Sequence, residues 1–595
     1  MKETTDKKPL TLLVVALILI LVGGLLAYFI QTSGGVSIKD VRFVGSEGKL
    51  VSALLYVPKG VTPKNPAPAI VATHGYINSR ETQDGFAIEF ARRGFIVLAP
   101  DQPGHGFSDP PSFINGFGGL DTLKYLRTLD IVDPNNIGLE GHSMGGWASV
   151  IAAGANKDGY KSLVLADSST GTFGAPNGTA DFPRNMALIF AKYDEFAPLM
   201  WGSLIPADIV KTDKLKKAFG TTETVEVGKL YGSIEKGTAR KLYQPNMTHA
   251  RVHFSRAGIG AAVEWMQATL KGGKNIPPSN QIWYWKELGN LIALIGMVIL
   301  LIALGGYLLK TDYFKELQEE PAPKKSMSGV GWWIGAAITV LLPIFLYWWA
   351  WWQHYDSNGI AKPSFIWPEQ LTTVIMFWAL GVAVVSLVLF LIWYFSTKKK
   401  SGATMADYGL TWKDNGLKWG KIGKSFLLSF VIVFIAHLTL IISTWLFQTD
   451  YRIWVFAVKP LDALHFGISL GYVIPFLFYF LVLGIVLHGQ MRPGKAVMGI
   501  GKETIINIIL LILGYFIFLA YHYIPLFSGG TLGIKLGSMI LGGIVLFQYI
   551  PIFAIVGLVT TYFYRKTGHI YVGAFLCTML ITWIIVAGEA VHFAY

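Results

Sequence analysis

The residues best able to do chemistry lie around Ser143, which stands between Gly141 and Gly145. A serine with glycines two residues before and two residues after it has the spacing of a nucleophile elbow. In that motif a strand turns sharply into a helix, and both neighbours must lack side chains because the two backbones approach closely. We therefore predict a strand over residues 137–139, a turn that exposes the hydroxyl group of Ser143, and a helix over 144–154.

A serine nucleophile needs a base to accept its proton and an acidic group to orient that base. Asp194 follows a predicted strand over 187–190 and is the candidate acid, with the adjacent Glu195 as the alternative. His249 is the candidate base because it lies in a predicted strand-to-helix loop, where a side chain is exposed. His253 is the rival base, but it would begin to enter the following helix.

Backbone N–H groups that stabilise an oxyanion are also expected near Ser143. The segment that ends with Tyr76 follows a predicted strand over 69–73, where one such donor is usually found. The backbone N–H groups of Tyr76 and Met144 are therefore the predicted oxyanion donors. We expect His74 and His105 to be structural, because two other histidines fit the role of base better.

The chain from residue 36 to residue 275 has the pattern of an α/β domain. Short β-rich runs alternate there with helical ones, which is typical of a sheet covered by helices. Strands are predicted at 41–44, 50–57, 69–73, 95–99, 137–139, 162–166, 187–190 and 240–243, and helices at 82–93, 118–129, 144–154 and 255–270.

Much of the remaining chain is apolar enough for a bilayer. The hydrophobic content is 52% and the mean hydropathy is +0.47, which is too apolar for a purely soluble protein. An N-terminal run over 10–30 is long enough to span and is predicted to be an uncleaved signal anchor. Eight further spans are predicted at 290–309, 329–352, 370–396, 425–447, 468–488, 504–525, 536–564 and 570–593. The expected organisation is an N-terminal tail and anchor (1–35), an α/β domain (36–275) and an all-α membrane bundle (276–595).

The charges of the loops predict how the chain is oriented. With nine spans, the loops on the N-terminal side carry 19 Lys and Arg residues, and the opposite short loops carry four. The positive-inside rule therefore places the N-terminus in the cytoplasm and the α/β domain outside it, in a multi-pass protein of the cell membrane. This distribution also explains the net charge of +13 without a nucleic-acid partner. The single cysteine, Cys577, excludes disulfides and cysteine metal sites within the chain.

Residues 40–272 resemble the α/β-hydrolase superfamily, close to its serine aminopeptidase, dienelactone-hydrolase-like and prolyl-oligopeptidase-like branches. The resemblance implies that Ser143 attacks an acyl carbon, His249 transfers the proton and Asp194 holds the imidazole, in the chain order of this fold. It implies no cofactor and no catalytic metal. The segments that carry it are Thr73–Tyr76, Asp101–Ser108, Val132–Gly146, Tyr193–Asp194 and Thr248–His249.

One segment departs from the simplest members of that superfamily. The 54 residues from Glu195 to Thr248 separate the candidate acid from the candidate base, whereas the usual cap position at 168–184 is short. We expect the apolar stretch from Phe196 to Ile205 either to shape an acyl pocket or touch the membrane, or simply to pack onto the core.

The predicted spans after residue 276 contain no recognisable motif. Three ionisable residues there, His437, Glu589 and His592, are functional candidates, with local hydrogen bonding as the alternative. The sequence as a whole favours a membrane-anchored serine hydrolase that cleaves acyl esters, with a small-molecule or lipid-like substrate and membrane lipids around it. A peptidase or amidase of the same fold is one alternative. The other is a transporter or lipid-handling protein with an accessory hydrolase-like domain. The oligomeric state is left open.

Overall fold

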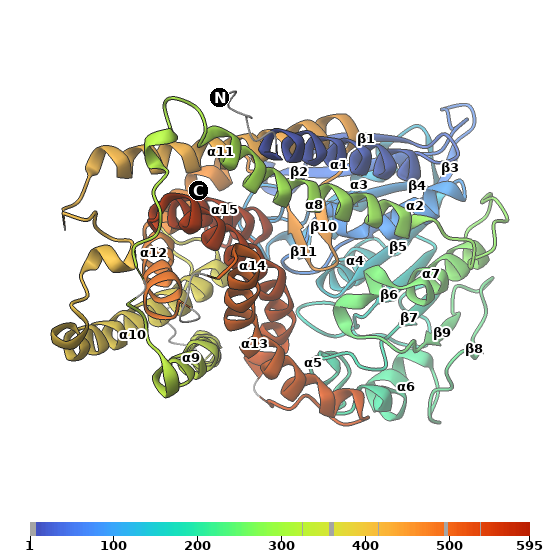
Figure 1. Ribbon diagram of the computed structural model, residues 1–595. Coiled ribbons are helices and arrows are strands. Elements are labelled where there is room, and N and C mark those ends of the chain that lie inside the picture. Colours follow the sequence, from blue (N-terminus) through green and yellow to red (C-terminus); the bar gives the residue numbers. More distant parts are fainter. Residues whose placement is uncertain (1–7, 324, 356–361, 415, 493–497, 536) are drawn as a thin grey trace.

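The structure is a computed structural model that describes residues 8–323, 325–355, 362–414, 416–492, 498–535 and 537–595 (Figure 1). A large sheet occupies the right of the view in Figure 1, and helices such as α9, α10 and α12 occupy the left. Residue 536, the first residue of one predicted span, lies outside the described ranges, as do four lysines counted in the predicted loops: Lys2, Lys7, Lys324 and Lys495.

The sheet has nine strands in the order β1-β2-β4-β3-β5-β6-β7-β9-β8. From β4 to β9 neighbouring strands are parallel, whereas β1, β2 and β8 are joined by antiparallel pairings. The carboxyl ends of the parallel strands therefore meet at one edge of the sheet, where ligands bind in open α/β folds. The strands are β1 Ser37–Val44, β2 Leu50–Val57, β3 Ala67–Thr73, β4 Ile96–Pro100, β5 Val132–His142, β6 Ser162–Ala166, β7 Met186–Ile189, β8 Leu230–Tyr231 and β9 Arg240–Tyr243.

Helices cover both faces of this sheet, which is why strands such as β3 are buried along their whole length. Leu123 and Val150 lie in the core on one face, and Phe86 and Ile259 lie in the core on the other. The helices that supply these residues are α3 Gly119–Thr128 and α4 Met144–Ala155 on the first face, and α2 Asp84–Arg92 and α7 Arg256–Thr269 on the second. We call residues 37–269 the sheet region.

The strand predictions hold closely, with two corrections. The strand predicted over 137–139 is longer: the residues Asp133–Asn136, which are turn-forming types, also belong to β5, and the register shifts there between Ala67 and Ala69 of β3. Extra residues on one strand are absorbed as a bulge rather than as a turn. The short strand β8 was not predicted, because two residues carry no periodic signal.

Among the described residues, nine helices are long and apolar enough to cross a membrane. This agrees with the predicted number of spans and with a multi-pass membrane protein. The helices are α1 Lys8–Gln31, α8 Trp283–Leu308, α9 Gly329–Tyr355, α10 Gln370–Ser401, α11 Trp419–Phe447, α12 Ala463–Gly484, α13 Ile500–Phe527, α14 Gly537–Thr567 and α15 Tyr571–Gly588.

Several helix ends differ from the prediction by a few residues, and two of them bear on the position of buried carboxyl groups. Helix α8 begins at Trp283, seven residues before the predicted start, because Glu89 accepts hydrogen bonds from the backbone N–H groups of Ile282 and Trp283 at 2.6 and 3.1 Å. Helix α15 ends at Gly588, so Glu589 follows the helix instead of lying within the last span. A hairpin of β10 Tyr451–Ile453 and β11 Phe456–Val458 connects α11 to α12 and was not predicted.

Helices α1 and α8, which flank the sheet region in sequence, pack against each other through small residues. A Cβ atom on Gly289 would lie 2.6 Å from the carbonyl oxygen of Gly23 and 2.8 Å from the backbone nitrogen of Ala27. Small residues of this kind let two membrane helices approach closely. Both ends of the sheet region are therefore tied to one helix pair.

We expect Gly289→Leu to destabilise the protein by at least ~1–3 kcal/mol, because the atoms that a side chain would meet are backbone atoms that cannot turn aside. The measurement is the thermal unfolding temperature of the full chain in detergent. The control is Gly467→Leu in α12, where no heavy atom lies within 4 Å of the new Cβ position. Equal melting temperatures for the two variants would contradict this account of the helix pair.

Candidate active site

Ser143 occupies the turn between β5 and α4, with φ 53° and ψ −120°. A positive φ is strained for a serine and persists only where its surroundings enforce it. The surroundings do so here, because a Cβ on Gly141 would lie 2.2 Å from the oxygen of Gly145, and one on Gly145 would lie 2.1 Å from that of Thr73. The backbone N–H of Ser143 also donates to the carbonyl of Ala166 at 3.0 Å. The predicted strand, turn and helix are confirmed.

Asp194 and His249 meet at a buried contact. Nδ1 of His249 lies 2.9 Å from Oδ2 of Asp194, and the second carboxylate oxygen accepts a hydrogen bond from the backbone N–H of Phe196 at 2.7 Å. Asp194 follows β7, and His249 begins a short 3-10 turn after β9. A carboxylate at Nδ1 fixes the ring and leaves Nε2 as the nitrogen that can accept a proton.

Glu195, the alternative acid, contacts the backbone of His249 and not its ring. Its Oε2 accepts a hydrogen bond from the backbone N–H of His249 at 2.8 Å, and its Oε1 accepts one from the hydroxyl of Tyr523 in α13 at 2.9 Å. Burial, together with the neighbouring Asp194 carboxylate, raises the pKa of Glu195 to about 7. This carboxyl therefore links a long helix to the loop of the candidate base.

The rival base, His253, has no carboxylate partner in the described part of the chain. It lies in the same 3-10 turn as His249, before α7 begins, and neither of its ring nitrogens has a hydrogen-bond partner among the described residues. Its ring packs edge-on against that of His142, with 4.1 Å between ring centroids, and burial lowers its pKa to about 3. A histidine that nothing orients is a poorer general base than His249.

His74 has the structural surroundings that we expected. Its Nδ1 lies 2.7 Å from the carbonyl of Gly75, and its Nε2 accepts the backbone N–H of Gln102 at 3.0 Å. Burial lowers its pKa to about 3. His105 is likewise buried, and its Nδ1 lies 3.0 Å from the carbonyl of Pro103.

Ser143, His249 and the two predicted oxyanion donors, Tyr76 and Met144, line one cavity of about 760 Å³, which we call the serine cavity. This volume is within the range of sites for drug-sized ligands, roughly 300–1,000 Å³. Its walls come from both halves of the chain. The residues after 276 that line it are Glu287, Gln370, Arg452, Trp454, Val455, Gly537, Ile540, Leu541, Ile544 and Gln548.

In the segment from Phe196 to Ile205, some side chains line the cavity and others pack in the core, so each of the two expectations holds for part of it. Phe196 and Leu199 line the serine cavity, and Leu199 is 43% exposed. Met200 and Trp201 are buried in the core of the sheet region instead. The reason is the short helix α5 Ala197–Trp201, which presents opposite faces to the cavity and to the core.

Residues after 276, which hold most of the long apolar helices, contact the sheet region around the site. We call them the long-helix half, and the sequence did not predict these contacts. The indole N–H of Trp454 donates to the carbonyl of Ala250, next to His249, at 3.1 Å. The hydroxyl of Tyr76 lies 3.0 Å from Nε2 of His592. Of the other ionisable candidates, His437 accepts the backbone N–H of Leu461 at 3.0 Å, which is the local alternative that we had considered for it.

One group of side chains in the described part of the chain could hold a metal ion. Ligand atoms of His142, Asp167 and His249 all lie within 4.8 Å of one another. The ring of His249 is also bonded to Asp194, and burial, together with the Asp194 carboxylate, raises the pKa of Asp167. A metal there would compete for the ring that the candidate acid orients. That this site works without a catalytic metal stays a prediction.

Residues 68–222 match the family described as alpha/beta hydrolase fold. Together with the sheet order and the turn at Ser143, this match confirms the predicted fold. The branch of the superfamily stays a prediction.

Individual relatives match only parts of the chain. The quorum-quenching protein AidA of Acinetobacter baumannii is 32% identical over 132 residues, which are 21% of this chain and 42% of that protein. A serine hydrolase-like protein of Dictyostelium discoideum is 32% identical over 93 residues, 15% of this chain and 26% of that protein. The chain thus spans less than half the length of these curated relatives. Among solved structures, a hyperthermophilic esterase of the archaeon Pyrobaculum calidifontis is 18% identical and covers 45% of this chain and 94% of its own, with a TM-score of 0.30.

The two faces of α5 predict different mutational effects. Trp201→Ala should destabilise the protein by roughly 3–5 kcal/mol, because it empties a fully buried site in the core, whereas Leu199→Ala should leave stability nearly unchanged. Thermal unfolding of the two variants measures the difference. A Leu199→Ala variant that melts as low as Trp201→Ala would contradict the assignment of faces.

Proposed function

We propose that this protein is a membrane-embedded serine hydrolase that cleaves acyl esters of lipid-like substrates. The observation that carries the proposal is that Ser143, at a strained turn, and His249, bonded to Asp194, line the same cavity. The match to the alpha/beta hydrolase fold and the similarity to a serine hydrolase-like protein support the same chemistry.

In the proposed reaction the Ser143 hydroxyl oxygen attacks the acyl carbon while His249 accepts its proton at Nε2. The backbone N–H groups of Tyr76 and Met144 stabilise the negative charge on the carbonyl oxygen. His249 then gives the proton to the leaving alcohol as the ester bond breaks, and Ser143 carries the acyl group. Water, deprotonated by His249, attacks this acyl-enzyme and releases the acid, after which the proton returns to Ser143. Asp194 keeps the imidazole oriented and stabilises its charged form throughout.

The walls of the serine cavity support a lipid-like substrate. Apolar side chains of α14, a helix long enough to span a membrane, form one wall. At its edge Phe113 and Phe173 are 50% and 61% exposed, so apolar surface continues outward from the cavity. An acyl chain would bury this surface, at roughly 25 cal/mol for each Å² removed from water.

For the arrangement in the cell, we propose an anchor over 1–35, an extracytoplasmic hydrolase domain over 36–275 and a membrane domain over 276–595, with a cytoplasmic N-terminus. The loop charges support this orientation. The segments that would lie outside also contact the sheet region, as Trp454 does at Ala250 and Val591 does at Ser112. The cell membrane is the proposed location, and nucleic acid is not a proposed partner.

Two other functions are compatible with the same framework. A peptidase or amidase would use the same serine, histidine and aspartate, because ester and amide hydrolases share this machinery. A transporter or lipid-handling protein would use the sheet region to recognise or trim its cargo. Reaction of Ser143 with an activated phosphonate separates a hydrolase from a purely recognising domain.

Fluorophosphonate labelling of the purified full chain tests the proposed nucleophile. Wild type should be labelled, Ser143→Ala should not be, and His249→Gln and Asp194→Asn should slow labelling by roughly 10³–10⁴-fold, because the serine loses its oriented base. His253→Gln is the matched control and should be labelled nearly as fast as wild type. Loss of labelling in His253→Gln with full labelling in His249→Gln would reverse the assignment of the base, and an unlabelled but folded wild type would contradict the hydrolase.

The contact between Glu195 and Tyr523 predicts a role for α13 in positioning His249. Tyr523→Phe removes the hydroxyl donor but keeps a ring that packs on Phe547, with 5.2 Å between centroids. We expect kcat on a p-nitrophenyl ester to fall roughly tenfold, with KM little changed, because a hydrogen bond to a buried carboxylate is lost and the loop of the base shifts.

Tyr521→Phe, on an exposed face of the same helix, is the control and should match wild type. An unchanged kcat in Tyr523→Phe, or an equal fall in both variants, would contradict the positioning role.

A further inference from the structure

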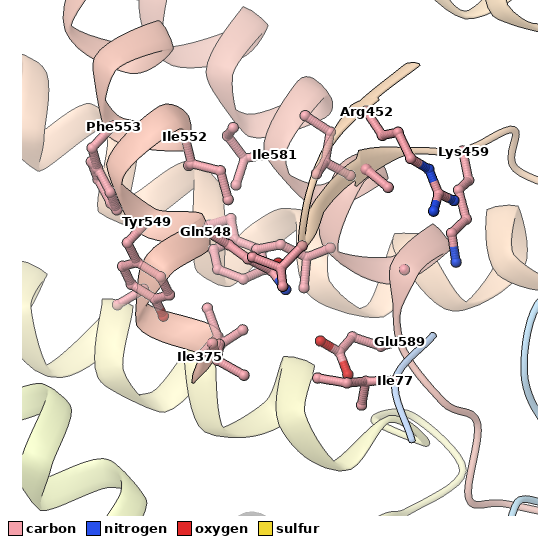
Figure 2. A pocket seen from close by; sticks show the side chains of 18 of the residues that line it. Ile77, Ile375, Arg452, Lys459, Gln548, Tyr549, Ile552, Phe553, Ile581 and Glu589 are labelled. Atoms are coloured by element: carbon pink, nitrogen blue, oxygen red, sulfur yellow. The ribbon is translucent and has the colours of Figure 1, made fainter. Parts of the chain in front are cut away.

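A second cavity, which we call the bundle cavity, lies beside the serine cavity and has a volume of about 50 Å³. Its lining is amphiphilic. Figure 2 shows Ile552, Phe553 and Ile581 toward one end and the charged side chains of Arg452 and Lys459 toward the other. By volume it has room for a few water molecules or for one small polar group, but not for an alkyl chain.

The two cavities share part of their walls. Residues from the sheet region, from the β10–β11 hairpin and from α14 line both spaces, so the two cavities are direct neighbours. The shared residues are Ile77, Asn78, Thr82, Arg452, Trp454, Val455 and Gln548.

The two cations that line the bundle cavity differ in their direct partners. Arg452 is paired with Asp450, whose oxygens lie 2.8 and 3.0 Å from its Nε. Lys459 is only 8% exposed, yet no hydrogen-bond or ion-pair partner for its ammonium group is found among the described residues. Burying an ammonium group without a partner is costly. An anion placed in the cavity would offset that cost.

The nearby carboxyl of Glu589 does not supply that anion. Its Oε2 has no hydrogen-bond partner in the described part of the chain, and it forms no ion pair with Lys459 there. Burial raises the pKa of Glu589 to about 8, although Lys459 opposes the rise. Its protonated form is therefore favoured, and it compensates the charge of Lys459 less than an ionised carboxylate would. The carboxylates of Glu81, Asp101 and Asp450 also act on Lys459, but none of them forms an ion pair with it among the described residues.

We propose that the bundle cavity is a subsite for the anionic group of an amphiphile, a phosphate or a carboxylate, whose alkyl chain lies in the serine cavity. Lys459 pairs with the anion, and the unpaired edge of the Arg452 guanidinium faces it. This inference rests on the proposed function only for its consequence, which is that the subsite makes the hydrolase selective for esters of anionic amphiphiles. A phosphate corresponds to the head group of the substrate, and a carboxylate corresponds to the released acid.

Binding is tested without catalysis, in full-length Ser143→Ala protein in dodecyl maltoside. Isothermal titration with dodecyl phosphate, laurate, dodecanol and inorganic phosphate compares the charge and the chain separately. We expect at least one of the two anionic amphiphiles to bind roughly tenfold more tightly than dodecanol, and inorganic phosphate more weakly than either, because only they use both cavities. Tighter binding of dodecyl phosphate indicates a substrate head group, and tighter binding of laurate indicates the acid product.

Variants of Lys459 locate the site. Lys459→Met should lose roughly tenfold in affinity for the anionic amphiphile, Lys459→Arg should retain it, and Lys535→Met, which removes an exposed lysine near α14, should not change it. Unchanged binding in Lys459→Met, or dodecanol that binds as tightly as both anions, would overturn the proposal.

A photolabel keeps the test decisive if a Lys459 variant does not fold. A dodecyl phosphate that carries a diazirine should attach to Trp454, Val455 or Gln548 in Ser143→Ala protein. Attachment confined to side chains exposed on the outside of the long helices, such as Trp445 and Ile474, would overturn the proposal. Fluorophosphonate labelling of wild type is an independent result, so a failed subsite and a failed hydrolase are told apart.

Discussion

Two adjacent buried carboxyls after β7 hold the site together, and each faces a different partner. Asp194 bonds to the ring of His249, while Glu195 bonds to the backbone of the same residue and to Tyr523 of α13. The position of the candidate base is therefore set from two directions, by the sheet and by a long apolar helix. Buried carboxyls are costly unless their oxygens are hydrogen-bonded. Displacing α13 would leave an oxygen of Glu195 without its partner beside the base.

The same joining of two halves shapes the space above Ser143. In an isolated α/β sheet the carboxyl edge of the strands faces solvent, whereas here α14 and the β10–β11 hairpin form part of the cavity wall. The bond from Trp454 to Ala250 holds that hairpin against the loop of His249. Under the proposed function, the long helices would have a role beyond anchoring, for which a single span would be enough. They supply apolar surface where an acyl group would lie.

Local signals in the sequence were sufficient for the framework of the site. Glycines two residues to either side of Ser143 predict a tight turn there because a strand signal precedes them and a helix signal follows, and Ser162–Ala166 forms a strand at its predicted bounds because apolar β-formers end at turn residues on both sides. The approach of Asp194 to His249 followed from placing each after a parallel strand. The bulge in β5 was missed because a proline and two asparagines resemble a turn.

The contacts across the two halves could not be predicted in this way. Tyr523 lies 328 positions from Glu195, and Trp454 lies 204 positions from Ala250. An apolar span has the same hydropathy whichever of its faces meets a neighbour, so no periodicity singles out a tyrosine near its end. The split roles within Phe196–Ile205 were hidden for a related reason, since α5 is only five residues long. Composition could suggest that this segment lines a pocket or packs in the core, but not which side chains do the one and which do the other.

The most direct test of the account is to see where an acyl chain lies when it is attached to Ser143. Full-length protein reacted with a dodecyl fluorophosphonate can be imaged by electron cryo-microscopy at side-chain resolution. We expect density that leaves the oxygen of Ser143 and runs along Trp454 and the apolar side chains of Ile540 and Ile544 in α14. A chain that instead turns outward past Phe173 without touching α14 would contradict the claim that both halves of the protein form one substrate site.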